Sequence, residues 1–108
     1  MAQNFRRSTS NNVGTSVVSV YTADSYDTIV GIALTNVSGS SINVDCYIND
    51  GSNDIYLVKN APIPVGSQLQ LIDGGAKIVV QNGDVIKVKS DVASSCDVWI
   101  SAVDSIST

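Results

Sequence analysis

The sequence predicts an all-β fold: an antiparallel β-sandwich of about eight strands with jelly-roll or immunoglobulin-like topology. Val, Ser, Ile, Asp and Asn are the commonest residues. Branched side chains suit the pleated surface of a strand, whereas short polar side chains compete with helical backbone bonds and favour turns. Apolar residues recur at every second position in several segments, and turn sequences separate these segments at close spacing. We therefore expect almost no helix.

The chain of 108 residues is long enough for one ordinary domain. Residues 1–12 are polar, contain both arginines and show no apolar period, so we expect an extended N-terminal arm outside the compact domain. A single β-sandwich domain is expected over residues 13–108.

Alternation of apolar and polar side chains marks the strands. The segment 28–36 is apolar on both sides, which is typical of a central strand that is covered twice. In the next segment, apolar side chains occupy every second position from Ile42 to Ile48, which makes it the clearest strand of the chain. The full set of predicted strands covers residues 14–22, 28–36, 42–49, 55–59, 68–71, 77–81, 85–89 and 95–103.

Two connections are predicted from their turn-forming residues. Pro62 and Pro64 lack the amide donor, so residues 60–66 are expected to form a crossing loop and not a central strand. Residues 73–76 read Asp-Gly-Gly-Ala and are expected to turn the chain between segments 68–71 and 77–81, which would form a hairpin.

The composition argues against several classes of function. Histidine is absent and all ten acidic residues are aspartates, which removes the commonest general bases and zinc ligands. The formal net charge of −4 argues against general affinity for nucleic acid or anionic membranes. No apolar run suits a secretory signal or a membrane span, so we expect synthesis in a cytoplasm. We expect no enzyme activity, no catalytic residue, no cofactor and no metal.

Cys46 and Cys96 occupy similar alternating positions in two predicted strands. They could meet across the sandwich as a disulfide, or they could be two small core residues. Without a secretion signal the reduced state is favoured. The only Trp, Trp99, lies three residues beyond the second Cys, whereas an immunoglobulin domain places it after the first.

Two further motifs are interpreted as turns. Oxygen ligands gather in one loop, which raises calcium as a hypothesis, but the spacing is wrong for an EF-hand and a hairpin turn is the simpler interpretation. The residues of this loop are Asp45, Asn49, Asp50, Asn53 and Asp54, with Gly51 at the turn. The triplet Asn36-Val37-Ser38 matches a glycosylation acceptor, which requires a secretory route, and we interpret it as a turn.

Candidate partner-binding residues are Phe5, Arg6 and Arg7 in the arm, and Tyr47 and Trp99 on the strands. The two arginines could grip a protein neighbour, although two charges in a Ser/Asn-rich segment also suit a solvated terminus. Tyr47 and Trp99 are expected on the side opposite the cysteines. Exposed aromatics flanked by polar residues are typical anchors of a contact surface, but the second sheet could equally cover them.

Six segments together carry a resemblance to a known family. They are Asn4-Phe5-Arg6-Arg7, residues 12–16, Val20-Tyr21-Thr22, residues 56–64, residues 83–88 and residues 93–98. On these segments the sequence resembles small virion structural proteins encoded by tailed phages of marine cyanobacteria and related hosts, and the resemblance covers nearly the whole chain. It implies a particle component and carries over no catalytic residue, because the matching segments are structural.

The expected function is therefore that of a non-enzymatic virion protein, a head decoration or cement subunit or a neck or tail accessory. Its expected partners are other virion proteins, namely major capsid, neck or tail subunits, with many symmetric copies or a homo-oligomer. The alternative is a receptor- or carbohydrate-binding module of a tail fibre, in which Tyr47 and Trp99 would stack on sugar rings.

Overall fold

The structure is a two-layer antiparallel β-sandwich. The computed structural model describes residues 4–24 and 26–104, with side chains throughout except at positions 4, 72–77 and 104. Within these ranges there is no helix, and hence none that could span a membrane. The eight strands are β1 (Asn4–Val13), β2 (Val18–Thr22), β3 (Asp27–Asn36), β4 (Ile42–Asn49), β5 (Asp54–Ile63), β6 (Gln68–Val80), β7 (Val85–Ser90) and β8 (Cys96–Asp104).

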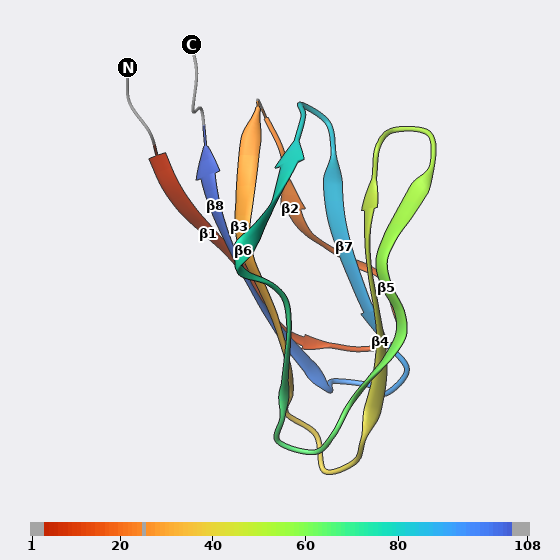
Figure 1. Cartoon of the computed structure of the whole chain (residues 1–108). Coiled ribbons are helices and arrows are strands. Elements are labelled where there is room, and N and C mark those ends of the chain that lie inside the picture. The colour runs from red at the N-terminus through yellow and green to blue at the C-terminus, as the bar shows by residue number, and fades with distance from the viewer. Residues whose placement is uncertain (1–3, 25, 105–108) are drawn as a thin grey trace.

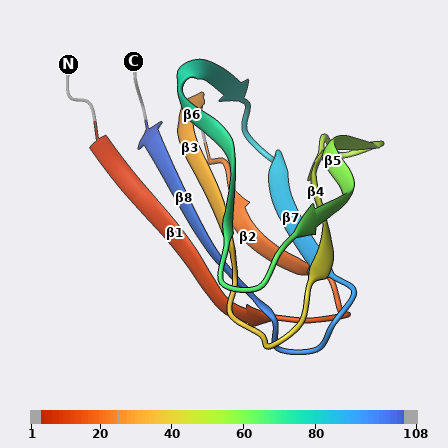
Figure 2. The ribbon, with the colours of Figure 1, turned by 60° about the horizontal axis from the view of Figure 1, so that its bottom comes forward.

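The strands form two sheets of four. The first sheet has the order β1-β8-β3-β6 and the second the order β2-β7-β4-β5. Figures 1 and 2 show the two layers facing one another, with β1 and β8 side by side. Four antiparallel pairs are nested: β1 with β8, β2 with β7, β3 with β6, and β4 with β5. This nesting is that of one long hairpin rolled into a sandwich, which is the jelly-roll topology.

The core consists of branched aliphatic side chains between the sheets. The alternation predicted from the sequence is present in β4, β7 and β8, where every second residue points inward. In β3 a register shift between Ile29 and Gly31 interrupts it, so that the inward-pointing residues are Ile29, Ile32 and Leu34. The first sheet contributes Ile29, Ile32, Leu34 and Ile100, and the second contributes Ile42, Val44, Ile86 and Val88, all at most 1% exposed. Burial of such side chains is the main stabilising contribution, about 1.5–3 kcal/mol each before entropic costs.

The connections between strands are also paired across the sandwich. The amide of Ser90 donates to the carbonyl of Gly14, and the amide of Val37 donates to that of Ser95. A side chain at Gly14 would be crowded, because a Cβ there would lie 3.1 Å from the backbone nitrogen of Ser94. The corner between β1 and β2 is therefore pressed against the β7–β8 connection, which fixes where β1 joins the sheet.

Residues 4–12 are not an arm outside the domain, as the sequence suggested. They belong to β1, which forms one edge of the first sheet and pairs antiparallel with β8. Among the side chains of this strand that the structure describes, those of residues 5–13, only Val13 is buried, and the sandwich-facing positions Arg6, Ser8 and Ser10 are polar. The strand is held by backbone pairing and not by an apolar face, so its sequence shows no apolar period.

The predicted crossing loop at residues 60–66 is partly wrong. Strand β5 continues to Ile63, and Pro62 lies opposite Asn43 of β4. β5 is the edge strand of the second sheet, and proline is tolerated at an edge where its missing donor faces away from the neighbour. The sequence rule excludes proline only from central strands.

The predicted hairpin at residues 73–76 is also wrong. Strand β6 runs from Gln68 to Val80, and it pairs with the same strand, β3, on both sides of residues 74–77. Its register shifts so that Ile78 lies opposite Ile29, and Asp73 opposite Gly31. The Asp-Gly-Gly-Ala segment is thus an irregular insertion within an edge strand, where a bulge disturbs only one neighbour.

The side chain of Asn36 is buried and hydrogen bonded on every side. Its amide nitrogen donates to the carbonyls of Ser40 at 2.8 Å and Ile63 at 2.9 Å, and its oxygen accepts from Ser38. Only 1% of the residue is exposed. The turn interpretation of Asn36-Val37-Ser38 is confirmed, because the amide of Ser38 donates to the side-chain oxygen of Asn36 two residues earlier.

We predict that Asn36→Asp destabilises the fold by at least about 2 kcal/mol, because it removes a donor from two carbonyls and places a carboxylate against them. The free energy of unfolding is measured by denaturant titration. Asn53→Asp, in an exposed turn, is the matched control and should change stability by less than about 0.5 kcal/mol. Equal effects of the two substitutions would contradict the structural role of Asn36.

Candidate functional site

Trp99 lies at the centre of the outward side of the first sheet. It is 51% exposed, while its neighbours in β8, Val98 and Ile100, point into the core. Its cross-strand partners are Thr9 of β1 and Ala33 of β3. The prediction that Trp99 projects from the sheet opposite the cysteines is confirmed by this alternation.

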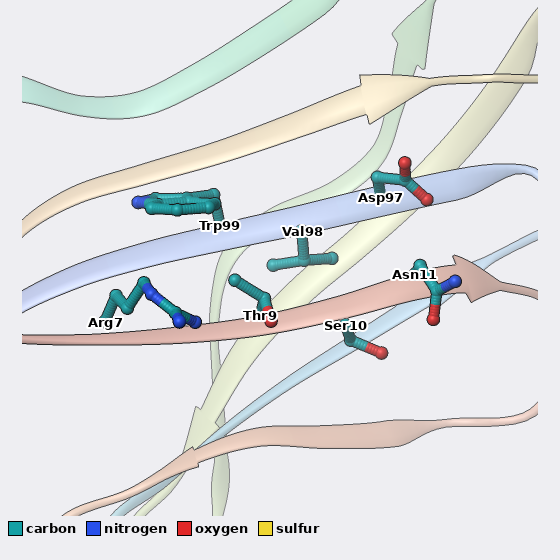
Figure 3. Close-up of a pocket in the computed structure, with 7 residues that line it drawn as sticks. All are labelled: Arg7, Thr9, Ser10, Asn11, Asp97, Val98 and Trp99. Atoms are coloured by element: carbon teal, nitrogen blue, oxygen red, sulfur yellow. The ribbon is translucent and has the colours of Figure 1, made fainter.

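Polar side chains surround Trp99 on both sides. We call this surface the Trp99 face; it is lined by Arg7, Thr9, Thr35, Gln68, Asp97 and Trp99. An open hollow of about 460 Å³ lies on the β1 side of the indole (Figure 3), and a second of about 370 Å³ lies over β3 and β6. The small side chain of Ala33 leaves space for the second hollow. An exposed aromatic ring with hydrogen-bonding groups around it can pack against a protein or a sugar.

Arg7 stacks against Trp99. Its guanidinium carbon lies 5.5 Å from the centroid of the indole, a distance typical of a cation–π contact. Arg7 is two residues from Thr9, the direct partner of Trp99, so the contact follows the diagonal of the β1–β8 ladder. The sequence could not reveal this pair, because β1 had been interpreted as a free arm.

Phe5 lies on the same outward side of β1 as Arg7, opposite Val103 of β8, and is 78% exposed. The predicted contact residues Phe5, Arg7 and Trp99 therefore share one surface. Asp97, Thr35 and Gln68 complete this surface, and they are not among the contact residues predicted from the sequence. Cross-strand register, which brings Thr35 opposite both Asp97 and Gln68, is the signal that would have identified them.

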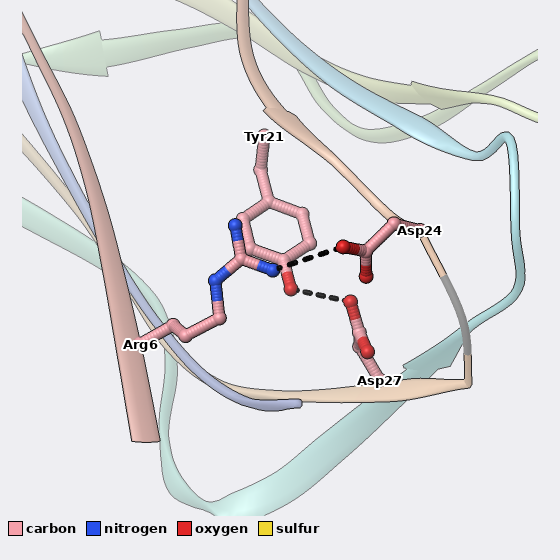
Figure 4. Close-up of polar contacts among 4 residues, drawn as sticks. All are labelled: Arg6, Tyr21, Asp24 and Asp27. Carbon is pink, nitrogen blue, oxygen red and sulfur yellow. Dashed lines mark hydrogen bonds and ion pairs between the residues drawn. The ribbon is translucent and has the colours of Figure 1, made fainter. Parts of the chain in front are cut away.

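Arg6 points to the other side of β1 and has a different role. Its guanidinium lies 3.6 Å from Asp24 and 5.6 Å from the ring centroid of Tyr21, which belongs to β2 in the opposite sheet (Figure 4). The hydroxyl of Tyr21 donates to the fully buried Asp27 at 2.5 Å. Arg6 thus links the edge strand β1 to the second sheet, a contact within the fold.

Tyr47 is on the outward side of the second sheet but is covered. Only 7% of it is exposed, because the ring of Tyr56 packs against it with centroids 4.8 Å apart. Burial, then the charges of Asp54, Tyr56 and Asp45, raise the pKa of Tyr47. Tyr47 and Trp99 are in different sheets and do not form a common surface.

The two thiols are free and fully buried in the core. Burial, reinforced by the neighbouring Cys96, raises the pKa of Cys46 to about 12. Burial and the charge of Asp97 raise the pKa of Cys96 to about 11. Of the two alternatives left open by the sequence, the structure shows the small core residues and not the disulfide.

The oxygen-rich loop between β4 and β5 is a hairpin turn. One carboxylate oxygen of Asp50 accepts the amides of Ser52 and Asn53, and these bonds, that from Asn53 foremost, lower the pKa of Asp50. Gly51 has a φ of +98°, which glycine adopts without strain. In the described parts of the chain, no group of three or more Cys and Asp side chains is placed to hold a metal ion.

Four further aspartates also accept hydrogen bonds from backbone amides. Each of these carboxylates accepts a hydrogen bond from a backbone amide in a turn or at a strand irregularity, where that amide lacks its ladder partner. The pairs are Asp45 with Asn60, Asp84 with Gln81, Asp91 with Asn43, and Asp97 with Asn12. Among the described residues, these aspartates fix backbone geometry.

We predict that Trp99→Ala lowers the free energy of unfolding by less than about 1 kcal/mol, the range of an exposed residue with one cation–π contact. The adjacent Ile100→Ala is the control and should cost about 2–5 kcal/mol, because it opens a cavity in the core. Unfolding is followed by far-ultraviolet circular dichroism. A cost at Trp99 as large as that at Ile100 would show that the indole is part of the core.

We also predict that the buried thiols weaken the fold in alkali. Their pKa values are higher in the folded protein than the ordinary value of 9.0, so the unfolded chain loses these protons first. The contribution of the protonated thiols to the free energy of unfolding is therefore full below pH 9. It falls as the pH rises towards 11, by about 1.4 kcal/mol per pH unit for each thiol.

The measurement is the difference in free energy of unfolding between the wild type and a Cys46→Ala/Cys96→Ala variant, taken from pH 8 to pH 11 under reducing conditions. The difference cancels the titration of the other groups. A difference that does not change with pH would contradict the burial of the thiols.

The fold has a counterpart among solved structures. No protein-family model and no curated protein sequence matches the chain. A chain in the acidic stable capsid structure of Helicobacter pylori bacteriophage KHP30 superposes with a TM-score of 0.61, covering 95% of this chain and 87% of that chain. The two sequences are 9% identical, so the likeness concerns the fold.

Proposed function

We propose that this protein is a structural component of a phage virion that acts by contact with neighbouring proteins. The observation that carries the proposal is the fold shared with a chain of a phage capsid over 95% of this chain and 87% of the other. The sequence resemblance to small virion proteins of tailed phages is a separate line of support. A fold alone does not define a function, so the surface must supply the rest.

The aspartates and the Trp99 face are consistent with this role. Five aspartates, including Asp50, bind backbone amides of the fold itself. The Trp99 face offers an exposed aromatic ring, a cation and several hydrogen-bonding groups, the combination that is enriched in protein interfaces. We propose that this face docks on a major capsid, neck or tail subunit. The proposed function of the chain is non-enzymatic.

Among the possible locations we propose the head, where the chain would be a decoration or cement subunit. Many symmetric copies multiply weak contacts, so a small interface per copy is sufficient. Quantitative mass spectrometry of purified particles of the phage that encodes the chain tests this. A copy number comparable to that of the major capsid protein is expected, a few copies would indicate a neck or tail accessory, and absence from the particles would refute the proposal.

A second candidate, a receptor- or carbohydrate-binding module of a tail fibre, is favoured by one observation. Trp99 is half exposed and flanked by hydrogen-bonding side chains, an arrangement that can stack on a sugar ring and bind its hydroxyl groups. A glycan array with the wild type and Trp99→Ala distinguishes the two. Glycan binding that depends on Trp99 would favour the fibre module, whereas the virion subunit is expected to bind none.

A further inference from the structure

The two sheets have four edge strands, namely β1 and β6 in the first and β2 and β5 in the second. An edge strand presents unpaired amides and carbonyls that can template the addition of another strand. Natural proteins block such edges with short strands, bulges, prolines or charges. The four edges of this fold differ in whether they are blocked.

Three edges are interrupted. β2 is five residues long and has a register shift between Ser19 and Tyr21. β5 has two register shifts, a positive φ at Asn60 and Pro62 within the strand. β6 has two register shifts against β3, and the larger one spans the Gly-Gly segment. These irregularities hinder continuous pairing with an added strand.

β1 is not interrupted over most of its length. Residues Asn4 to Ser10 pair with β8 one by one, without a register shift, and the irregularity begins only near Asn12, where φ is +55°. No proline occurs in the strand. In an antiparallel ladder, alternate residues direct their backbone groups away from the partner strand. β1 therefore offers a regular edge from Asn4 to Ser10 to an additional strand.

The side chains of β1 indicate which strand would fit. β1 contains Arg6 and Arg7 and no acidic residue, in a chain whose net charge is −4. On the outward side, the exposed Phe5 and Arg7 are two residues apart. Stacking on Trp99 occupies the face of the Arg7 guanidinium but leaves its in-plane donors able to bind a carboxylate. Residues opposite one another in paired strands interact directly.

A second copy of this chain is a poorer occupant of this edge. Any β1–β1 pairing joins two strands that each carry two arginines and no acid. If the symmetry axis passes through position 7, the two exposed Arg7 side chains lie directly opposite one another, which is destabilising. Arg6 adds less to this repulsion, because it is paired with Asp24 within the fold. An acidic partner avoids this repulsion and gains a cross-strand ion pair.

We infer that the free edge of β1 binds an extended acidic segment of another protein as an added strand, with an apolar residue opposite Phe5 and a carboxylate opposite Arg7. The partner motif is thus apolar-x-acidic or its reverse, according to strand direction. Main-chain hydrogen bonds supply affinity and the two side-chain positions supply selectivity. The inference extends the docking role proposed above but concerns the isolated chain, so its failure would leave the virion proposal standing.

The test is an NMR titration of the full isotope-labelled chain with synthetic seven-residue peptides. The probe is acetyl-Thr-Thr-Val-Thr-Asp-Thr-Thr-amide, whose central Val-Thr-Asp keeps the same spacing, together with its sequence reversal and versions of both with Lys in place of Asp. We expect shift changes and slowed amide exchange in β1. We also expect the better Asp peptide to bind about fivefold more tightly than its Lys version, the ratio of one cross-strand ion pair.

Charge exchange provides the decisive control. Arg7→Glu should reverse the preference towards the Lys peptides. Lys59→Glu is the matched control, because Lys59 is also a cation over an aromatic ring on an edge strand, at 4.9 Å from the centroid of Tyr56. It should leave the preference unchanged. Absence of binding at millimolar peptide, shift changes at another edge, equal affinity for Asp and Lys peptides, or a β1-mediated dimer in sedimentation equilibrium would each overturn the proposal.

Discussion

The nested pairing of strands is the constraint on which the rest of this structure depends. The first strand pairs with the last, the second with the seventh, and so on inward to the β4–β5 hairpin. Two further pairings, β3 with β8 and β4 with β7, close the four-stranded sheets. Because six of the seven connections cross from one sheet to the other, neither sheet can form without its partner. The aliphatic core between them, with its two free thiols, is a consequence of this arrangement.

The outward surfaces of the two sheets differ in how far their aromatic side chains are already packed within the chain. In the second sheet, Tyr47 and Tyr56 pack on one another and Lys59 lies over the ring of Tyr56, so much of the aromatic area is already used within the chain. In the first sheet, Trp99 is half exposed, with Arg7 over its ring and small or polar neighbours around it. The edge strand β1 adjoins this surface. The Trp99 face and the β1 edge therefore form one continuous region of the surface.

The sequence predicts the fold class and the central strands because these depend on local alternation. β3, β4, β7 and β8 are buried by their own apolar positions, and Trp99 is exposed for the same reason. β1 was missed because its pairing is through the backbone, and the irregular edge strands β5 and β6 were misjudged because rules about proline and glycine assume central strands. Pair identity could not be predicted, since it depends on contacts between residues as far apart as Thr9 and Trp99. Because these contacts depend on pair identity, the Arg7–Trp99 contact and the covering of Tyr47 by Tyr56 could not be predicted either.

The central claim is that this chain functions by binding neighbouring proteins through its first sheet. A cryo-EM reconstruction of the intact particle at a resolution that shows side chains tests it most directly. The account predicts density of a neighbouring subunit against Trp99 and along β1, with the hollows beside the indole filled. A particle in which this surface faces solvent and every contact is made through the second sheet would contradict the account.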